Sequence, residues 1–188
     1  MILFGDCDIL STLKTRYLVF IVYSEVMSET IDRTCCFTGH RTIPPSDYHK
    51  IKENLTKAII ELIHHNYRFF GAGGALGFDT LAALTVLRLK ENYPHNKLIL
   101  VLPCLSQTNG WLEKDKKIYQ WIKKQADKVV YTSPEYTPGC MHKRNRHLVD
   151  HSSFCICYLK KPMGGTAYTV DYALQKGRKV LNIAEINR

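Results

Sequence analysis

The feature that most constrains this 188-residue chain is a glycine-rich junction at residues 68–84, RFFGAGGALGFDTLAAL. A short apolar run leads into a loop, and the loop leads into a helix-forming stretch. The loop contains four glycines: Gly71, Gly73, Gly74 and Gly77. Glycines let a backbone approach a ligand closely, and the free N–H groups of a helix's first turn attract an anion. Gly77 falls four residues after Gly73, which departs from the GxGxxG of dinucleotide enzymes, so this loop alone fits a phosphate site and an ordinary α/β connection about equally.

Apolar runs alternate with stretches of helical periodicity along the rest of the chain. The runs lie at residues 34–38, 69–70, 97–102, 128–131, 154–159 and 179–183. The run at 97–102, KLILVL, is typical of a strand that is buried on both faces of a parallel sheet. Helices are expected between the runs, and Ser46 or Asp47 is expected to cap the first of them. The pattern predicts an α/β fold, a single Rossmann-like domain with a mostly parallel, doubly wound sheet and helices on both faces.

Glycine and polar residues gather where the predicted strands end. In a doubly wound sheet, ligands bind beyond the carboxyl ends of the strands. The candidate binding residues are Gly39, His40 and Arg41 after the first strand, Gly73, Gly74, Gly77 and Asp79 after the second, Pro103 and Gln107 after the third, Gly164, Gly165 and Thr166 after the fifth, and Arg144 on a basic helix at 139–150. Their convergence on one edge predicts a single ligand pocket.

Individual roles follow from side-chain chemistry. Arg41 and Arg144 are expected to contact phosphate, because a guanidinium offers paired donors. An ordinary surface or ion-pair arginine is the alternative, and it weighs more for Arg41. Asp79 either accepts from ribose hydroxyls or caps its helix, and His40 is interpreted as neutral and structural. Backbone N–H groups and a hydroxyl are expected to cradle the phosphate at Gly73, Gly74, Gly165 and Thr166.

Composition narrows the class of partner. The net charge of +9 favours an anionic partner, and 45% hydrophobic with 23% charged residues argues against wholesale disorder. The seven cysteines are odd in number and form no CxxC pair, which indicates free thiols in a reducing cytoplasm and no metal site. Four of them fall in strand-like runs and are expected to be small core residues: Cys35, Cys36, Cys155 and Cys157.

Residues 1–31 stand apart from a domain that spans residues 32–188. Their apolar run at 17–23 is too short to span a bilayer, and they lack the basic start and small-residue cleavage site of a signal peptide. We expect a cytoplasmic location and no association with a membrane. Three interpretations of the first 26 residues remain open: an added strand, a flexible extension, or an upstream assignment of the start where Met27 is the native initiator.

The motifs together resemble a known family. They are CFTGHR at 36–41, GGALGFD at 73–79, LPC at 102–104 followed by Gln107 and Trp111, GCM at 139–141 with RNR at 144–146, and GGTA at 164–167. In unbroken order over about residues 33–185, they are similar to the YpsA-like family of the SLOG superfamily, which also contains DprA and the LOG phosphoribohydrolases. The resemblance implies a Rossmann-like fold that binds nucleotides or nucleotide-derived ligands at these loops.

The LOG enzymes cleave the N-glycosidic bond of a nucleoside monophosphate and carry an arginine-lysine pair and a PGGxGTxxE turn. Met141 with Arg144 resembles the first motif, and residues 164–166 resemble part of the second. Their glutamate position is Thr169 here, and a carboxylate matters because it would stabilise positive charge on the ribose. LOG-type activity is therefore disfavoured and no catalytic residue is assigned, although Asp79 remains a substitute carboxylate.

Turns of DprA resemble GHR at 39–41 and GFD at 77–79, which would suit single-stranded DNA. Trp111, Tyr136 and Tyr168 form no aromatic stripe that the sequence can place, so nucleic acid is less favoured than a small nucleotide. The leading interpretation is a cytosolic binding or sensor protein for a nucleotide-derived small molecule, without a cofactor, acting with or without a protein partner. A LOG-like hydrolase and DprA-like DNA binding are the alternatives, and a homodimer remains open.

Overall fold

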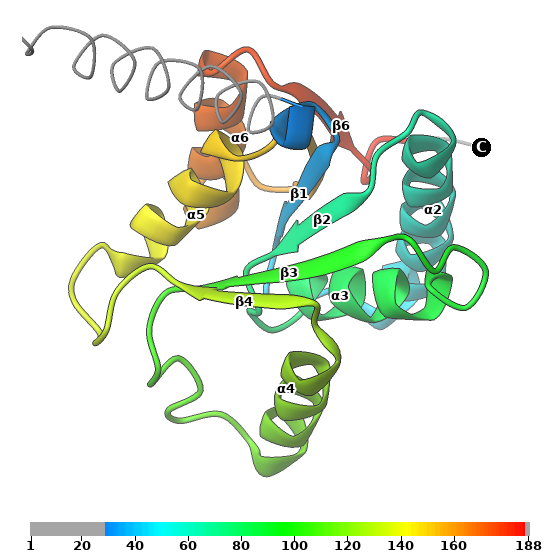
Figure 1. The fold of residues 1–188 in the computed structure, drawn as a ribbon. Coiled ribbons are helices and arrows are strands. Elements are labelled where there is room, and N and C mark those ends of the chain that lie inside the picture. Colours follow the sequence, from blue (N-terminus) through cyan, green and yellow to red (C-terminus); the bar gives the residue numbers. More distant parts are fainter. Residues whose placement is uncertain (1–28, 187–188) are drawn as a thin grey trace, which may run out of the picture.

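The computed structural model describes residues 29–186, so the interpretations of the first 26 residues lie outside the described part. Residues 29–32 are helical and lead into the sheet. The elements that follow are β1 (Thr34–Gly39), α2 (Pro45–His64), β2 (Phe69–Ala72), α3 (Phe78–Leu89), β3 (Lys97–Leu102), α4 (Glu113–Gln125), β4 (Lys128–Tyr131), α5 (Cys140–Asp150), β5 (Phe154–Tyr158), α6 (Gly165–Gln175) and β6 (Lys179–Asn182) (Figure 1). Each apolar run of the sequence forms a strand. No helix among residues 29–186 has the length and apolar character needed to cross a membrane.

The six strands form one parallel sheet in the order β4-β3-β2-β1-β5-β6. The chain first adds β2, β3 and β4 on one side of β1, and then crosses to place β5 and β6 on the other side. The strand order therefore reverses between β1 and β5. This confirms the predicted doubly wound, Rossmann-like sheet, and the crevice above such a reversal is where this architecture binds ligands.

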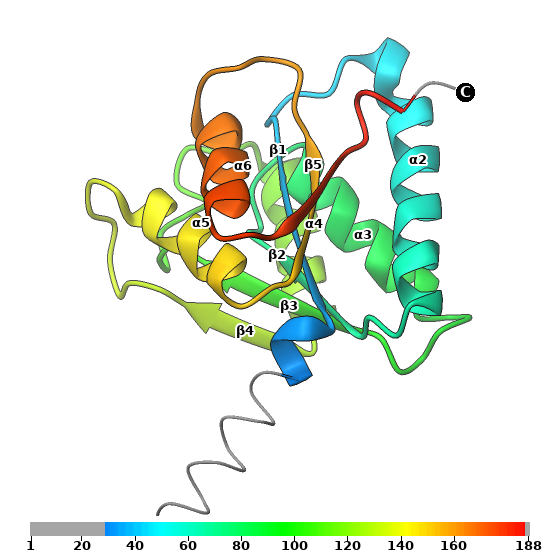
Figure 2. The same cartoon turned by 90° about the horizontal axis from the view of Figure 1, so that it is seen from above.

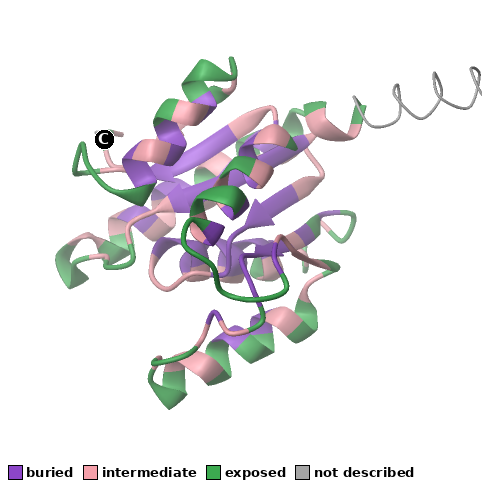
Figure 3. Ribbon diagram, turned by 90° about the vertical axis from the view of Figure 1, so that its left-hand side faces the viewer, coloured by how far each residue is buried: buried purple, intermediate pink, exposed green. Residues whose placement is uncertain are grey.

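Helices cover both faces of the sheet. The helices α2, α3 and α4 lie on one face, and α5 and α6 lie on the other (Figures 1 and 2). Along β1, Cys35 and Phe37 pack with the first group, whereas Cys36 packs with the second, as the period of two in a strand requires. The four inner strands, β1, β2, β3 and β5, are mostly buried between partly exposed helices, and the edge strands β4 and β6 are only partly buried (Figure 3). The predicted core role of Cys35, Cys36, Cys155 and Cys157 is confirmed, because all four are buried.

The prediction that Ser46 or Asp47 caps α2 is wrong. The helix follows Pro44 and begins at Pro45, and neither Ser46 nor Asp47 caps it. Proline suits the first helical position, because its fixed φ angle is helical and its missing N–H would have had no helical partner. Asp47 instead accepts a hydrogen bond from Lys160 Nζ at 2.6 Å, next to the carboxyl end of β5. A tertiary contact thus takes the carboxylate that the sequence assigned to the cap.

Candidate functional site

A cavity of about 280 Å³ opens at the carboxyl edge of the sheet, between the loops that follow β1 and β5. It is the position that the strand reversal predicts. Eight of the predicted site residues line it: Gly39, His40, Arg41, Asp79, Arg144, Gly164, Gly165 and Thr166. The other five lie outside its lining: Gly73, Gly74, Gly77, Pro103 and Gln107. The structure therefore brings loops from distant parts of the sequence together around one cavity, but fewer residues line this cavity than the sequence predicted.

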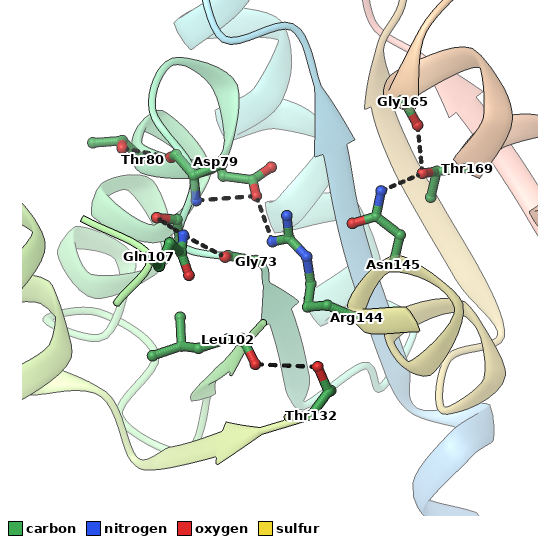
Figure 4. Close-up of polar contacts among 12 residues, drawn as sticks. Gly73, Asp79, Thr80, Leu102, Gln107, Thr132, Arg144, Asn145, Gly165 and Thr169 are labelled. Carbon is green, nitrogen blue, oxygen red and sulfur yellow. Dashed lines mark hydrogen bonds and ion pairs between the residues drawn. The ribbon is translucent and has the colours of Figure 1, made fainter. Parts of the chain in front are cut away.

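A buried ion pair forms one wall of the cavity. Arg144 on α5 places its Nη1 3.3 Å from Oδ2 of Asp79 on α3, and each residue is only 5% exposed (Figure 4). Burial raises the pKa of Asp79 against the opposing charge of Arg144, and burial lowers the pKa of Arg144 against the opposing charge of Asp79. The Nε donor of Arg144 is buried and has no partner among the described residues. A buried guanidinium therefore reaches the cavity with hydrogen-bonding capacity left over.

The glycine loop after β2 supports this ion pair from below. A Cβ atom on Gly73 would lie 1.2 Å from Nη1 of Arg144, so the missing side chain makes room for the guanidinium. Gln107 donates from Nε2 to the carbonyl oxygens of Gly73 at 3.3 Å and Gly74 at 2.8 Å, and thereby holds the loop (Figure 4). Pro103 is buried. In the structure the two glycines and Gln107 therefore support Arg144 from outside the cavity lining, while the phosphate contact expected of Gly73 and Gly74 stays a prediction.

The loop after β1 interlocks with the start of α3. Gly77 has a φ angle of 75°, and a Cβ there would lie 2.3 Å from the carbonyl oxygen of Arg41. The backbone N–H of Phe78 donates to the carbonyl oxygen of His40 at 3.1 Å. A Cβ on Gly39 would in turn meet the ring of Phe78 at 2.4 Å. The two glycines allow a close approach that sets Arg41 at the mouth of the cavity.

The N-terminus of α6 closes the opposite side of the cavity. Gly164 precedes the helix with a φ angle of 92°, which glycine adopts without strain, and open space surrounds the Cβ position of Gly165. The N–H of Tyr168 makes the first helical bond, to Gly164, so the N–H groups of residues 165–167 have no helical acceptor. The positive end of the helix dipole therefore faces the same space as Arg144.

Thr169 occupies the position where a LOG enzyme carries glutamate. It is buried, its Oγ1 donates to the carbonyl oxygen of Gly165 at 2.7 Å, and it accepts from Nδ2 of Asn145 at 2.7 Å (Figure 4). Among residues 29–186, Asp79 is the only carboxylate that lines the cavity, and Arg144 is its partner. Within the described lining, no carboxylate is free of a cation.

His40 lines the cavity and holds the loop between β5 and α6. Its Nε2 accepts from the backbone N–H of Lys160 at 2.9 Å and from that of Lys161 at 3.3 Å. Burial, followed by the charge of Lys161, lowers the pKa of His40. The two hydrogen bonds and the lowered pKa both favour the neutral ring that the sequence suggested, and the ring also borders the cavity.

Five lining residues were not assigned as site residues from sequence: Thr38, Ala75, Met141, Asn145 and Met163. Met141, Arg144 and Asn145 are spaced by three and four residues, so they share one face of α5. That spacing is the signal that would have added Met141 and Asn145 to the candidate set. Met163 is 79% exposed at the rim, where only the tertiary position of its loop identifies it.

The fold and the site define an all-parallel Rossmann-like protein with a cationic cavity at the reversal of its strand order. A family model described as the YspA SLOG family (YpsA) matches residues 38–187, and the chain belongs to this family. It is 32% identical over 138 residues to the uncharacterized SPbeta prophage-derived protein YoqJ of Bacillus subtilis, covering 66% of this chain and 80% of that one. It is 30% identical over 129 residues to a UPF0398 protein of Halalkalibacterium halodurans, covering 67% and 68%.

Two solved structures share the fold. DNA processing protein A of Streptococcus pneumoniae aligns with a TM-score of 0.59 at 18% identity over 78% of this chain and 48% of that one. DNA processing protein A of Helicobacter pylori, described for its single-stranded DNA binding mode, aligns with a TM-score of 0.57 at 19% identity over 82% and 66%. This chain therefore spans about half of the Streptococcus pneumoniae protein, and at these identities the likeness concerns the fold alone.

Proposed function

We propose that this protein binds the phosphate-bearing part of a nucleotide or nucleotide-derived molecule in the cavity above β1 and β5, as a binding or sensor protein of the cytoplasm. The observation that carries the proposal is Arg144. Arg144 is only 5% exposed, it lines the cavity together with the N-terminus of α6, and its buried Nε donor has no partner among the described residues. A desolvated cation attracts an anion more strongly than a surface cation does, because the effective dielectric constant is lower.

The charges and the size of the cavity agree with this ligand class. Arg41 adds a second, exposed guanidinium at the mouth, and the one carboxylate in the described lining is already paired with Arg144. The volume of about 280 Å³ is close to the lower end of small-molecule sites, roughly 300–1,000 Å³. A phosphate with its sugar would fill the cavity, and the remainder of the ligand would extend past Met163 into solvent.

The cavity lining offers no uncompensated carboxylate among the described residues, which favours binding without hydrolysis. Cleavage of an N-glycosidic bond builds positive charge on the ribose, and an ionised carboxylate facing the sugar would stabilise it. Thr169 cannot supply that charge, and the charge of Asp79 is already balanced by Arg144. A hydrolase that uses Asp79 is the outcome that product analysis would reveal.

The test is a binding screen with product analysis. Thermal-shift and calorimetric measurements would use nucleoside mono- and diphosphates, ADP-ribose, NAD and cyclic nucleotides, because a ligand above its dissociation constant raises the melting temperature. Arg41→Ala should weaken the best ligand about 10- to 100-fold, as expected for one charge-assisted hydrogen bond. Arg88→Ala, on the exposed side of α3, is the matched control and should change nothing. No binding by any nucleotide, or equal affinity in Arg41→Ala, would sink the proposal.

Single-stranded DNA is a second candidate, favoured by the outer face of α5 and α6. Arg146 donates to the hydroxyl of Tyr168 at 3.0 Å, and the ring of His142 lies 4.4 Å from that of Tyr168. The rings of Tyr168 and Tyr172 are nearly parallel, 6.5 Å apart, and Lys176 lies over Tyr172. Tyr168, which the sequence singled out, thus lies among half-exposed rings and basic side chains on this face.

Basic groups interleaved with aromatic rings suit a single strand whose bases stack. Binding of an oligothymidylate should fall steeply with salt, because each phosphate contact releases counterions. Tyr168→Ala should weaken the oligonucleotide and leave a mononucleotide unaffected, since Tyr168 does not line the cavity. Failure of the wild-type protein to bind the oligonucleotide at low salt would exclude this candidate.

A further inference from the structure

One imidazole fixes the segment that connects β5 to α6. Residues 160–164 carry Met163 to the rim of the cavity and end at the first turn of α6. Nε2 of His40 accepts from two successive backbone N–H groups in this segment, those of Lys160 at 2.9 Å and Lys161 at 3.3 Å. Two donors that converge on one ring nitrogen require that nitrogen to be unprotonated, with the ring's proton on Nδ1.

The charged groups around His40 favour the same neutral state. Lys161 and Arg41 are cations beside it, and the edge contact with the Tyr158 ring at 5.6 Å brings no negative charge. Two carboxylates lie on the elements packed around it. Asp47 accepts from Lys160 Nζ at 2.6 Å and from the Tyr158 hydroxyl at 3.3 Å, and Asp79, which lines the same cavity, is paired with Arg144. No described carboxylate is thus left to stabilise an imidazolium at this position.

We propose that His40 is a positioning residue, which as a neutral acceptor holds residues 160–164 and aligns the N-terminus of α6 with Arg41 and Arg144. Its protonation replaces the acceptor by a third N–H, which faces the N–H groups of Lys160 and Lys161. The segment is then released, and the first turn of α6 loses its alignment with the two arginines. The effect on ligand affinity rests on the proposed function, whereas the effect on the segment does not.

The direction of the pH effect follows from the environment. Because burial and Lys161 lower the pKa of His40, its ring stays neutral at pH 7 and takes up a proton only below its ordinary pKa of about 6.5. The unfolded or released chain binds that proton more readily, so the clamp is present above this range and is lost as the pH falls through it. Anion affinity should follow the same midpoint.

The first experiment needs no ligand. In the ¹⁵N-labelled full chain, we expect the Nε2 resonance of His40 to report an unprotonated nitrogen at neutral pH. The amides of Lys160 and Lys161 should lose exchange protection at the same midpoint at which His40 titrates. His40→Met removes the acceptor, so both amides should exchange about 5- to 100-fold faster, as expected from two lost hydrogen bonds.

One variant separates the role of the acceptor from that of the titrating ring, and a second variant is its control. His40→Gln keeps an acceptor near the Nε2 position and does not titrate, so it should restore amide protection and abolish the pH dependence. His95→Gln, an exposed histidine in the loop before β3, is the matched control and should leave both unchanged. A protonated Nε2 at neutral pH, or unchanged amide exchange in His40→Met, would overturn the clamp.

The second experiment measures affinity for inorganic sulfate as a function of pH. Sulfate keeps its charge in this range, whereas a phosphate monoester takes up a proton near pH 6. The wild-type protein should bind sulfate more weakly below the His40 midpoint, and His40→Gln should not. If the amides respond but sulfate affinity does not, the alignment of α6 by His40 is refuted. If no variant binds sulfate at any pH, the proposed function fails, and the amide exchange still decides the clamp.

Discussion

Gly73→Ala should expel Arg144 from its buried position. The new Cβ would lie 1.2 Å from Nη1 and 2.3 Å from Cζ of Arg144, and 2.6 Å from Oδ2 of Asp79. Ordinary van der Waals contact needs about 3.5 Å, so the guanidinium has to shift by roughly 2 Å. The ion pair with Asp79 is already 3.3 Å long, and a shift of this size separates it. Because packed protein surrounds the rest of Arg144, the cavity is the direction in which it moves.

The magnitude follows from the carboxylate that is left behind. Removing one partner from a buried ion pair costs about 3–5 kcal/mol. Two effects reduce this figure here: Arg144 shifts without leaving the chain, and Asp79, whose pKa is already raised by burial, takes up a proton when its partner leaves. We expect a loss of about 2–4 kcal/mol, which for a protein of this size lowers the melting temperature by roughly 5–15 °C.

The assay is urea unfolding of the full chain at neutral and mildly acidic pH. The loss should be smaller on the acidic side, because a protonated Asp79 needs no cation. Gly165→Ala is the matched control: open space surrounds its Cβ position, so the change should stay within about 0.5 kcal/mol. In the Arg144→Ala background, Gly73→Ala should cost much less than in the wild type, since the two changes remove the same interaction.

Two results would refute this reasoning. One is a Gly73→Ala variant as stable as Gly165→Ala, which would mean that the guanidinium moves at no cost. The other is strict additivity with Arg144→Ala, which would mean that Gly73 is required for something other than the space it leaves for the arginine.

Three further predictions concern the same fold. Gly77→Ala should destabilise the protein by more than about 2 kcal/mol in urea unfolding, because it strains a residue at a φ angle of 75° and forces a Cβ against the Arg41 carbonyl; a near-neutral effect would contradict the interlocked loops. Thr169→Glu should lower stability by about 2–4 kcal/mol and release no base from nucleoside monophosphates, since it buries a charge and removes two hydrogen bonds; base release detected by chromatography would restore the hydrolase. Burial raises the pKa of Asp127, but hydrogen bonds from two lysines and a backbone amide outweigh it and lower the pKa overall. The stability from this carboxylate is therefore present above its ordinary pKa of about 3.9 and is lost as the pH falls through the lower folded value; Asp127→Asn should flatten that part of the acid unfolding profile, and an unchanged profile would contradict the assignment.

Local patterns were enough to locate the strands. The ranges of β3, Lys97–Leu102, and β4, Lys128–Tyr131, coincide with the predicted runs, because apolar β-forming residues end there at polar or turn-forming neighbours. The same reasoning led to the parallel sheet, since helical stretches separate all six runs. It also led to the edge at which the loops meet, because strand direction fixes which loops share that edge.

Long-range contacts decided the roles of individual side chains. Asp47 serves Lys160, 113 residues later, in place of the start of its own helix. Asp79 neither caps a helix through its side chain nor faces the ligand space alone, because Arg144 reaches it from 65 residues away. A glycine in the sequence indicates that a side chain is missing, but which atoms use the space depends on how the elements pack. At Gly73 that space holds the guanidinium of Arg144. This placement requires α5 to lie on the opposite face of the sheet from α3.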